Sequence, residues 1–227
     1  MSHYYQHEGR VYPSVTTILQ SCRGESPGIA KWRQNLIRQG RDPAAETRRS
    51  QVVGTLAHYR CLNPLGPTTL ELPIQEIDEC TPDIIRDVEL CEVMFNELLP
   101  ALNLGHPRIR ETFVANEAEG YGGKFDLVAP SGGKRTLFDL KTSKQVYDTH
   151  LLQMGGYSAA LKSNGIVVDQ GAVVALHYKP ENNPTLRGHI HWVSREDLDR
   201  YEREFIALAR QYQQEHGEEI HAANCST

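Results

Sequence analysis

The sequence predicts an α/β (α+β) fold, in which a central mixed β-sheet of about five strands is flanked by helices. Three observations predict it. The first half of the chain has helical periodicity, the middle alternates apolar and polar residues as strands do, and one helical segment separates the third strand from the fourth. The chain has 227 residues, which suits one compact domain. Within it we expect a helical N-terminal region at 1–105, which covers or arches over the sheet, and a core at 106–227 with the sheet, the crossover helix and the C-terminal helix.

Three helices are predicted ahead of the sheet. The segment 11–21 precedes them and begins extended, because Pro13 restricts Tyr12 to non-helical backbone. Asp42 and Thr81 each stand before a proline, which is the usual combination of a helix cap and a first helical residue. The predicted helices span 26–39, 42–61 and 81–102. The first has its large apolar residues on one side, at Ile29, Trp32, Leu36 and Ile37.

Five strands and two further helices are predicted after this region. The turn Pro-Ser-Gly-Gly at 130–133 joins the second and third strands into a hairpin. A crossover helix at 149–162 follows, a loop at 180–184 separates the last two strands, and Ser194 caps the final helix with Asp197 as its partner. The predicted strands span 108–115, 124–129, 136–141, 171–178 and 188–193.

The composition excludes several classes of protein. The five cysteines are odd in number and form no CxxC pair, so we expect neither a disulfide framework nor a structural zinc site, and a reducing compartment is indicated. No stretch reaches the length of a membrane span and the N-terminus lacks an apolar signal core, so we expect a soluble, cytoplasmic protein without a membrane partner. The net charge of -5 gives no overall sign of nucleic-acid binding, but a local basic groove is compatible with it.

Two aspartates and a lysine form the candidate reaction centre. Asp139 and Lys141 are two residues apart on one predicted strand, so they share a face, while Leu140 points the other way. Asp126, on the partner strand of the hairpin, lies at the same edge. Carboxylates of this kind bind Mg²⁺, which activates water and stabilises charge on a phosphate, and a neighbouring lysine can serve the attacking water. Ordinary surface charges near a turn are the alternative, because a lone DxK pattern is common.

Three further features favour the reaction centre. Gln153 and Tyr157 share a face of the crossover helix and could hold a phosphate or a base; the alternative is a half-buried tyrosine beside a solvated glutamine. The intervening Gly155-Gly156 pair suggests that something approaches this helix closely. His58 and Glu111 are candidate extra metal ligands, with a satisfied histidine and an exposed strand glutamate as the alternatives.

The ordered set of motifs resembles the PD-(D/E)xK nuclease superfamily, and within it the RecB-type branch. That pattern is a helix histidine, an aspartate in a GxxD strand, a DxK strand and a QxxxY helix. It matches His58, GGKFD with Asp126, FDLK with Asp139 and Lys141, and QMGGY with Gln153 and Tyr157. The opening YPSVTTIL is also similar to the N-terminal segment of mitochondrial genome maintenance exonucleases and related phage and bacterial proteins.

The resemblance implies a restriction-endonuclease-like core and a Mg²⁺- or Mn²⁺-dependent DNA phosphodiesterase, often one that starts at free single-stranded ends, in the cytoplasm of a bacterium or of a phage host. It implies that Asp126 and Asp139 bind the metal with the backbone carbonyl of Leu140, that His58 poises it, and that Lys141 serves the water. Gln153 and Tyr157 would then position DNA, with Lys144 and Arg33 as further contacts. Many members have glutamate where this chain has Asp139, although aspartate is usual in this branch. Without clustered cysteines, no iron–sulfur cluster is expected. Recombination or replication proteins are the implied protein partners.

Other functions remain as alternatives. Neither GGK motif is a phosphate-binding P-loop, because the upstream glycine and the following serine or threonine are missing. His177, His189 and His191 could form a zinc site on two neighbouring strands. A catalytically inactive DNA-binding or recombination accessory protein on the same fold is the alternative from another class. The basic residues of the first two helices could line an arch over DNA or form a solvated face: Lys31, Arg33, Arg38, Arg48 and Arg49.

Overall fold

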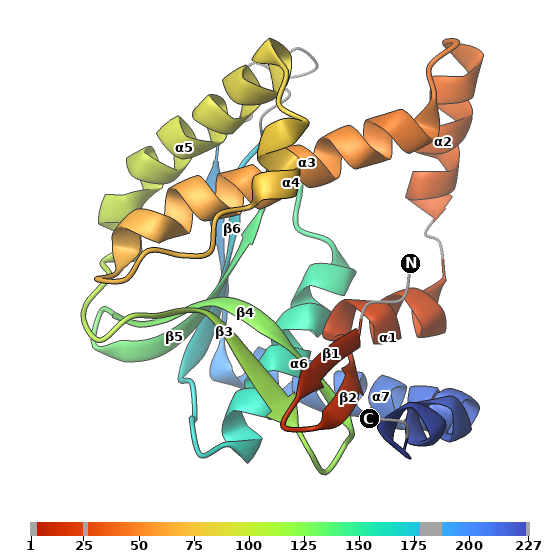
Figure 1. Cartoon of the computed structure of the whole chain (residues 1–227). Helices are drawn as coiled ribbons and strands as arrows, with labels where there is room; N and C mark the ends of the chain where they lie inside the picture. Colours follow the sequence, from red (N-terminus) through yellow and green to blue (C-terminus); the bar gives the residue numbers. More distant parts are fainter. Residues whose placement is uncertain (1–3, 25–26, 178–187, 226–227) are drawn as a thin grey trace.

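Five strands form one mixed sheet, in the order β3-β4-β5-β6-β7, in the computed structural model of the chain (Figure 1). The structure describes residues 4–24, 27–177 and 188–225. The strands of the sheet are β3 (Ile109–Asn116), β4 (Tyr121–Ser131), β5 (Lys134–Lys141), β6 (Gln170–Ala175) and β7 (His189–Val193). The five predicted strands are therefore confirmed, with ends that differ by a few residues. The predicted loop at 180–184 lies outside the described residues.

The pairing makes the sheet mixed, as the sequence predicts. β3, β4 and β5 pair antiparallel, and so do β6 and β7, whereas β5 and β6 run parallel. The parallel pair requires a crossover, which the helix α6 (Asp148–Ser163) supplies. The hairpin between β4 and β5 turns at Gly132 and Gly133, both with positive φ angles of 56° and 84° that glycine tolerates.

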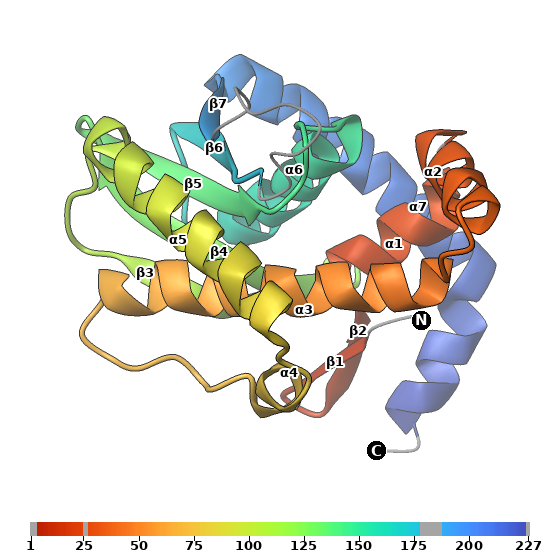
Figure 2. The ribbon, with the colours of Figure 1, turned by 90° about the horizontal axis from the view of Figure 1, so that it is seen from above.

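Helices cover both faces of the sheet (Figures 1 and 2). One apolar core joins one face to α1, α6 and α7, and a second core joins the opposite face to α3 and α5. The remaining helices are α1 (Val15–Arg23), α2 (Pro27–Arg38), α3 (Pro43–Leu62), a short 3-10 helix (Asn63–Leu65), α4 (Ile74–Asp78), α5 (Pro82–Leu102) and α7 (Arg195–Cys225). The strands β4 and β5 contribute to both cores, because successive side chains point to opposite faces.

The helix caps lie where the sequence predicts them. The Asp42 carboxylate accepts a hydrogen bond from the Ala44 amide at 2.9 Å at the start of α3. At the start of α7, the Ser194 hydroxyl accepts one from the Asp197 amide at 3.1 Å. These side chains satisfy backbone amides that have no partner within the helix.

A hairpin and a helix lie at the N-terminus, where the sequence predicts only an extended start to the segment 11–21. β1 (Tyr4–His7) and β2 (Arg10–Pro13) form a separate antiparallel hairpin, and α1 follows it directly. Ser14 caps α1 by accepting a hydrogen bond from the Thr17 amide at 2.9 Å. The β-branched run that opens α1 has poor helix propensity, so burial of Val15 and Ile18 in the core decides the helix.

The helix α2 projects from the body of the protein (Figure 1). Its predicted apolar side remains largely in solvent: Leu36 is buried, but Ile29, Trp32 and Ile37 are 48%, 36% and 60% exposed. An apolar stripe therefore predicts this helix correctly without predicting that the stripe is buried.

The closely packed partner of the crossover helix is α7. A Cβ on Gly155 would lie 2.5 Å from the backbone of Tyr201, and a Cβ on Gly156 would lie 3.0 Å from the ring of Phe205. The sequence prediction of a close approach at this glycine pair is thus confirmed, and what approaches is another helix of the same chain.

The cysteines whose side chains are described are all free thiols, at Cys22, Cys61, Cys80 and Cys91. Among the described residues, no helix is both long enough and apolar enough to cross a membrane. The division into regions at 1–105 and 106–227 stays a prediction.

Candidate active site

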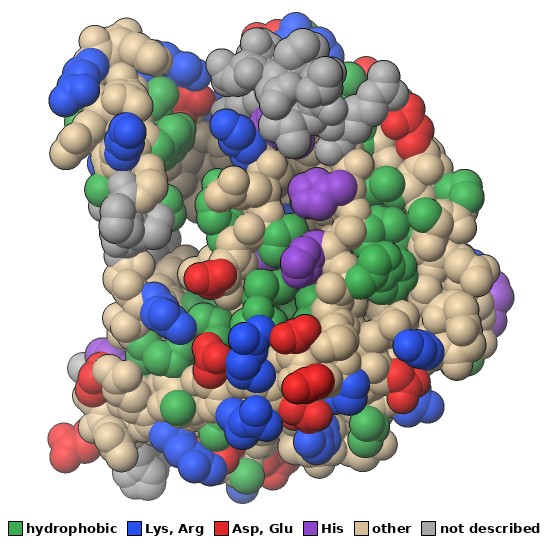
Figure 3. Space-filling model, turned by 180° about the vertical axis from the view of Figure 1, so that it is seen from behind, with side chains coloured by type: hydrophobic (Ala, Val, Ile, Leu, Met, Phe, Trp, Pro, Cys, Tyr) green, Lys and Arg blue, Asp and Glu red, His purple; other side chains and the backbone are tan. Residues whose placement is uncertain are grey.

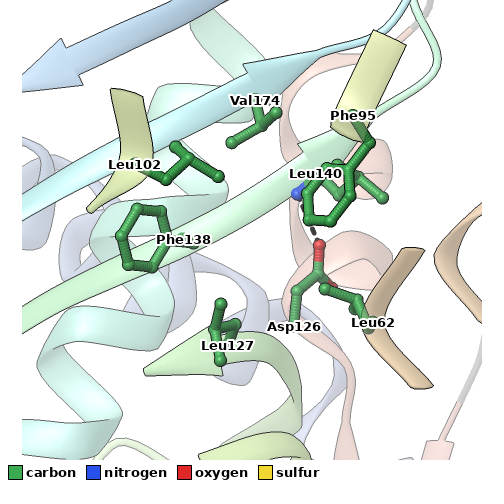
Figure 4. Close-up of a pocket in the computed structure, with 8 residues that line it drawn as sticks. All are labelled: Leu62, Phe95, Leu102, Asp126, Leu127, Phe138, Leu140 and Val174. Carbon is green, nitrogen blue, oxygen red and sulfur yellow. Dashed lines mark hydrogen bonds between the residues drawn. The ribbon is translucent and has the colours of Figure 1, made fainter. Parts of the chain in front are cut away.

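The two candidate aspartates lie where β4 and β5 separate. The last registered pair between these strands is Leu127 with Phe138, so Asp126 and Asp139 are the first residues beyond the ladder. The Leu140 amide, freed from the ladder, donates a hydrogen bond of 2.6 Å to Oδ2 of Asp126 (Figure 4). The Asp126 carboxylate therefore replaces a strand carbonyl as the acceptor, which fixes its position.

Asp126 also borders a small pocket in the second core. Figure 4 shows its carboxylate among otherwise apolar side chains from α3, α5, β4, β5 and β6. Apolar walls lower the local dielectric, so charges at this point interact more strongly than they would in water.

Asp139 and Lys141 form a buried ion pair on β5. The Lys141 ammonium donates a hydrogen bond of 2.9 Å to Oδ1 of Asp139 and lies 2.8 Å from Oδ2. Asp139 is 1% exposed, and its Oδ2 makes no hydrogen bond within the described part of the chain. Burial raises the pKa of Asp139 to about 6, with the Asp126 charge adding to the effect and Lys141 opposing it. This carboxylate oxygen is thus buried, and it contacts the Lys141 ammonium without forming a hydrogen bond to it.

The ammonium of Lys141 is stabilised in its charged form. Burial by itself would lower the pKa of Lys141, but the nearby charges of Asp139 and Asp126 outweigh it and raise that pKa. The lysine is therefore a fixed positive charge at the site.

His58 reaches Asp126 from α3, which packs on the face of the sheet opposite to α6. Its Nδ1–H donates to the Gly54 carbonyl at 2.8 Å, and its Nε2 lies 3.1 Å from Oδ2 of Asp126. Burial would lower the pKa of His58, but attraction and hydrogen bonding to Asp126 raise it to about 9. For Asp126 burial by itself would raise the pKa, but the charges of His58 and Lys141 outweigh it, so the pKa of Asp126 is lowered. The structure thus places His58 against Asp126, and its role as a metal ligand stays a prediction.

Glu111 adds a third carboxyl group beside Asp126. It lies on β3 between the registered residues Arg110 and Thr112, with a positive φ of 45° that is unusual for a residue with a side chain. Burial and the Asp126 charge raise the pKa of Glu111 to about 7, although the charges of His58, Lys124 and Lys141 oppose them. Strained backbone of this kind persists where the surrounding structure enforces it, and such residues cluster at functional sites.

Gln153 and Tyr157 of α6 lie beside these groups. We use the name inner site for both residues together with Asp126, Asp139, Lys141, His58 and Glu111. The Gln153 amide donates a hydrogen bond of 3.3 Å to the Tyr157 hydroxyl. Tyr157 is buried, and its pKa lies well above the ordinary value because of burial, with the charges of Asp126 and Asp139 adding to the effect. A Cβ on Gly123 would lie 2.8 Å from the Tyr157 ring, so this glycine of the GGKFD motif makes room for the tyrosine of the QMGGY motif.

The two predicted basic contacts are exposed side chains. Lys144 is exposed on the loop after β5, and Arg33 is exposed on the projecting α2. Figure 3 shows Lys and Arg side chains on α2, with a hollow between α2 and the body of the protein. Two of the five cations that could line an arch have acidic partners, because Arg48 pairs with Glu76 and Glu79, and Arg49 pairs with Asp87.

The donor set suits a hard divalent ion. Mg²⁺ and Mn²⁺ prefer carboxylate oxygens, and two aspartates meet here with one buried oxygen that makes no hydrogen bond. Among the described residues, no three His, Cys, Asp or Glu side chains converge in an arrangement that could hold an ion. At the aspartates, ion pairs with His58 and Lys141 use the carboxylates instead.

The alternative zinc site is not assembled. His189 and His191 are exposed on β7, whereas His177 is buried after the end of β6. All three are described residues, and they belong to no group of three that could hold a metal.

Sequence reasoning missed two side chains at this site. His150 lies on α6 three residues before Gln153, and burial, together with the charge of Lys141, lowers its pKa. The signal for His150 was its helical spacing from Gln153. Tyr5, on the N-terminal hairpin, has its pKa raised by burial and to a lesser degree by Glu111. No local pattern connects Tyr5 with the site, because it lies in a hairpin that the sequence did not predict.

A mixed sheet that brings an aspartate to an Asp-x-Lys strand at a point of strand separation is consistent with a restriction-endonuclease-like core. A family model for the PD-(D/E)XK nuclease superfamily matches residues 30–227, and the chain belongs to this superfamily. No curated protein matches the chain. Among solved structures, the crystal structure of SSO0001 matches with 15% identity and a TM-score of 0.32, over 70% of this chain and 74% of that chain.

Proposed function

We propose that this chain is a divalent-metal-dependent nuclease that hydrolyses phosphodiester bonds in DNA. The observation that carries the proposal is the meeting of Asp126, Asp139 and Lys141 where β4 and β5 separate, with one buried carboxylate oxygen lacking a hydrogen bond. Desolvated carboxyl groups with perturbed pKa values are typical of reaction centres.

Asp126 and Asp139 are the proposed ligands of Mg²⁺ or Mn²⁺, with the backbone carbonyl of Leu140 and the Glu111 carboxylate as further donors. When bound, the ion supplies an activated water and neutralises charge on the phosphate. The charge of Asp126 contributes to raising the pKa of Glu111, so the two carboxyl groups are close enough to support a shared cation.

Lys141 and His58 act on either side of the metal ligands. The charged state of Lys141 favours its action as a donor that orients the attacking water or stabilises charge developing on the phosphate. His58 holds Asp126 in place through a contact of 3.1 Å and becomes available to poise the metal when that contact opens. The helical region 1–105 thus contributes to the site through α3.

DNA positioning is proposed for α6 and for the exposed cations. Gln153 and Tyr157 lie beside the carboxylates, and Lys144 and Arg33 are exposed toward solvent. The ordered motifs support the RecB-type branch, similar to mitochondrial genome maintenance exonucleases, and with it an exonuclease acting on single-stranded or free DNA ends. On that basis we place the protein in DNA repair, recombination or replication.

The test is a cleavage assay on end-labelled oligonucleotides that are linear, circular or blocked at one end, with Mg²⁺, Mn²⁺ or EDTA. We expect Mg²⁺-dependent cleavage that falls by at least about a hundredfold in Asp139→Asn and in Lys141→Met, with unchanged folding. Lys134→Met is the matched control, since Lys134 is an exposed lysine at the far end of the same strand.

The outcomes separate the candidate functions. Full cleavage by either site variant refutes the assigned centre. DNA binding without any cleavage by the wild-type protein identifies an accessory protein on the same fold. Cleavage of blocked or circular DNA at the rate of linear DNA contradicts an exonuclease.

A further inference from the structure

A row of polar and aromatic side chains leads along α6 from the carboxylates to solvent. Tyr157, Gln153 and His150 follow one another at helical spacings of four and three residues, and Tyr147 precedes the helix by one more such step. Their exposure rises in the same order, from 6% at Tyr157, through half-buried Gln153 and His150, to 44% at Tyr147. We call these four residues the α6 track.

Tyr147 contacts His150 through both its ring and its backbone. The two rings lie 5.3 Å apart between centroids, in an edge-to-face arrangement with an interplanar angle of 81°. The Tyr147 amide donates a hydrogen bond of 3.3 Å to Nδ1 of His150, and the His150 amide donates one of 2.9 Å to the Tyr147 carbonyl. An exposed aromatic ring that is fixed in this way loses little conformational freedom when it binds a ligand.

His150 links this exposed ring to the reaction centre. Because Nδ1 accepts a hydrogen bond, the neutral imidazole carries its proton on Nε2, which leaves Nε2–H as a donor. Burial, with the Lys141 charge, lowers the pKa of His150 to about 4, so the ring stays neutral at physiological pH. His150 therefore supports Tyr147 as a neutral hydrogen-bonding group within electrostatic reach of Lys141.

We propose that Tyr147, supported by His150, stacks against a base of single-stranded DNA whose backbone continues along the α6 track to the reaction centre. This inference rests on the proposed nuclease function. The track extends about 15 Å along the helix, which is enough to hold several nucleotides. Stacking on a tyrosine requires an accessible base face, which single strands offer and duplexes hide. Lys144, exposed three residues before Tyr147, provides a cation for the phosphates.

The experiment measures binding of the full chain, in EDTA, to a fluorescein-labelled single-stranded deoxyoligonucleotide by fluorescence anisotropy. Tyr147→Ala should weaken binding by about 5- to 100-fold, the range expected for losing one stacked base. Tyr147→Phe should bind like the wild type, because it keeps the ring. Trp192→Ala is the matched control, since Trp192 is 43% exposed and packs at the other face of the sheet, on Phe138.

A second set of oligonucleotides, each with one abasic position, identifies the interaction as stacking. At the position that Tyr147 contacts, wild type and Tyr147→Ala should bind with equal affinity, and a blunt duplex should show no effect of the substitution. Unchanged binding of the single strand by Tyr147→Ala, or an equal loss at every abasic position, would overturn the proposal. If the stacking proposal fails but the wild-type protein still cleaves DNA with Mg²⁺, the proposed nuclease function stands. If the wild-type protein does not cleave DNA, both the nuclease function and the stacking proposal are refuted.

Discussion

Gly155→Ala tests the close contact that positions α6, the helix that carries Tyr157 and Gln153. The added Cβ would lie 2.5 Å from the backbone of Tyr201 on α7, and backbone atoms cannot rotate away as a flexible side chain can. Overpacking of this kind costs about 1–3 kcal/mol, whereas replacing a helical glycine by alanine stabilises by up to about 1 kcal/mol. Because the contact is with rigid backbone, we expect the upper part of the overpacking range, about 2–3 kcal/mol, and after the gain in helix propensity a net loss of about 1–2 kcal/mol.

The matched control is Gly217→Ala, on the same helix α7 that Gly155 contacts. No atom lies within 4 Å of a Cβ built on Gly217, so only the gain in helix propensity applies. This variant should be more stable than the wild type by about 0.5–1 kcal/mol.

The assay is thermal unfolding followed by circular dichroism, without metal. For a chain of this size 1 kcal/mol corresponds to a change in Tm of about 2–4 °C, so Gly155→Ala should melt roughly 2–8 °C lower and Gly217→Ala roughly 1–4 °C higher. The two substitutions are chemically identical, and only the neighbouring backbone makes their effects opposite in sign. A shift of both Tm values in the same direction would refute the reasoning.

Two further predictions concern the inner site. Glu111→Gln should stabilise the metal-free protein by about 1–3 kcal/mol at pH 8 and little at pH 4. The reason is that the pKa of Glu111 is about 7 in the folded protein, raised from 4.5, so the wild type loses stability as the pH rises through that interval. Urea unfolding at both pH values measures the effect, and an equal effect at both would contradict the prediction. Gly123→Ala should destabilise the protein by about 1–3 kcal/mol, because the added methyl group would contact the Tyr157 ring. In a double-mutant cycle of unfolding free energies, Tyr157→Leu should reduce that loss. Strictly additive effects of the two substitutions would argue against the contact.

Local patterns were sufficient for the sheet and for the DLK strand. Alternation placed β3, β4 and β5, the turn at 130–133 joined two of them, and the spacing of Asp139 and Lys141 put their side chains on one face. The superfamily followed from the order of short motifs, and the family match agrees with it. All of these depend on neighbours in sequence, where the period of a helix or strand determines which residues meet.

Some features had only weak local signals. The hairpin of β1 and β2 and the helix α1 were not predicted; α1 opens with a β-branched run of poor helix propensity and depends on burial of Val15 and Ile18 in the core. The exposure of Trp32 on α2 and the ion pairs of Arg48 and Arg49 were equally hidden, since spacing along a helix does not say what packs against it.

By itself the sequence determined which residues lie on which strand or helix face, and therefore that Asp126, Asp139 and Lys141 gather at one edge. Only the tertiary structure decided that His58, 68 residues before Asp126, contacts its carboxylate, and that Glu111 adopts a left-handed backbone beside it. The physical reason is the range of the interactions: periodicity acts over a few residues, whereas the packing of α3 and α6 on the sheet joins residues that share no local pattern.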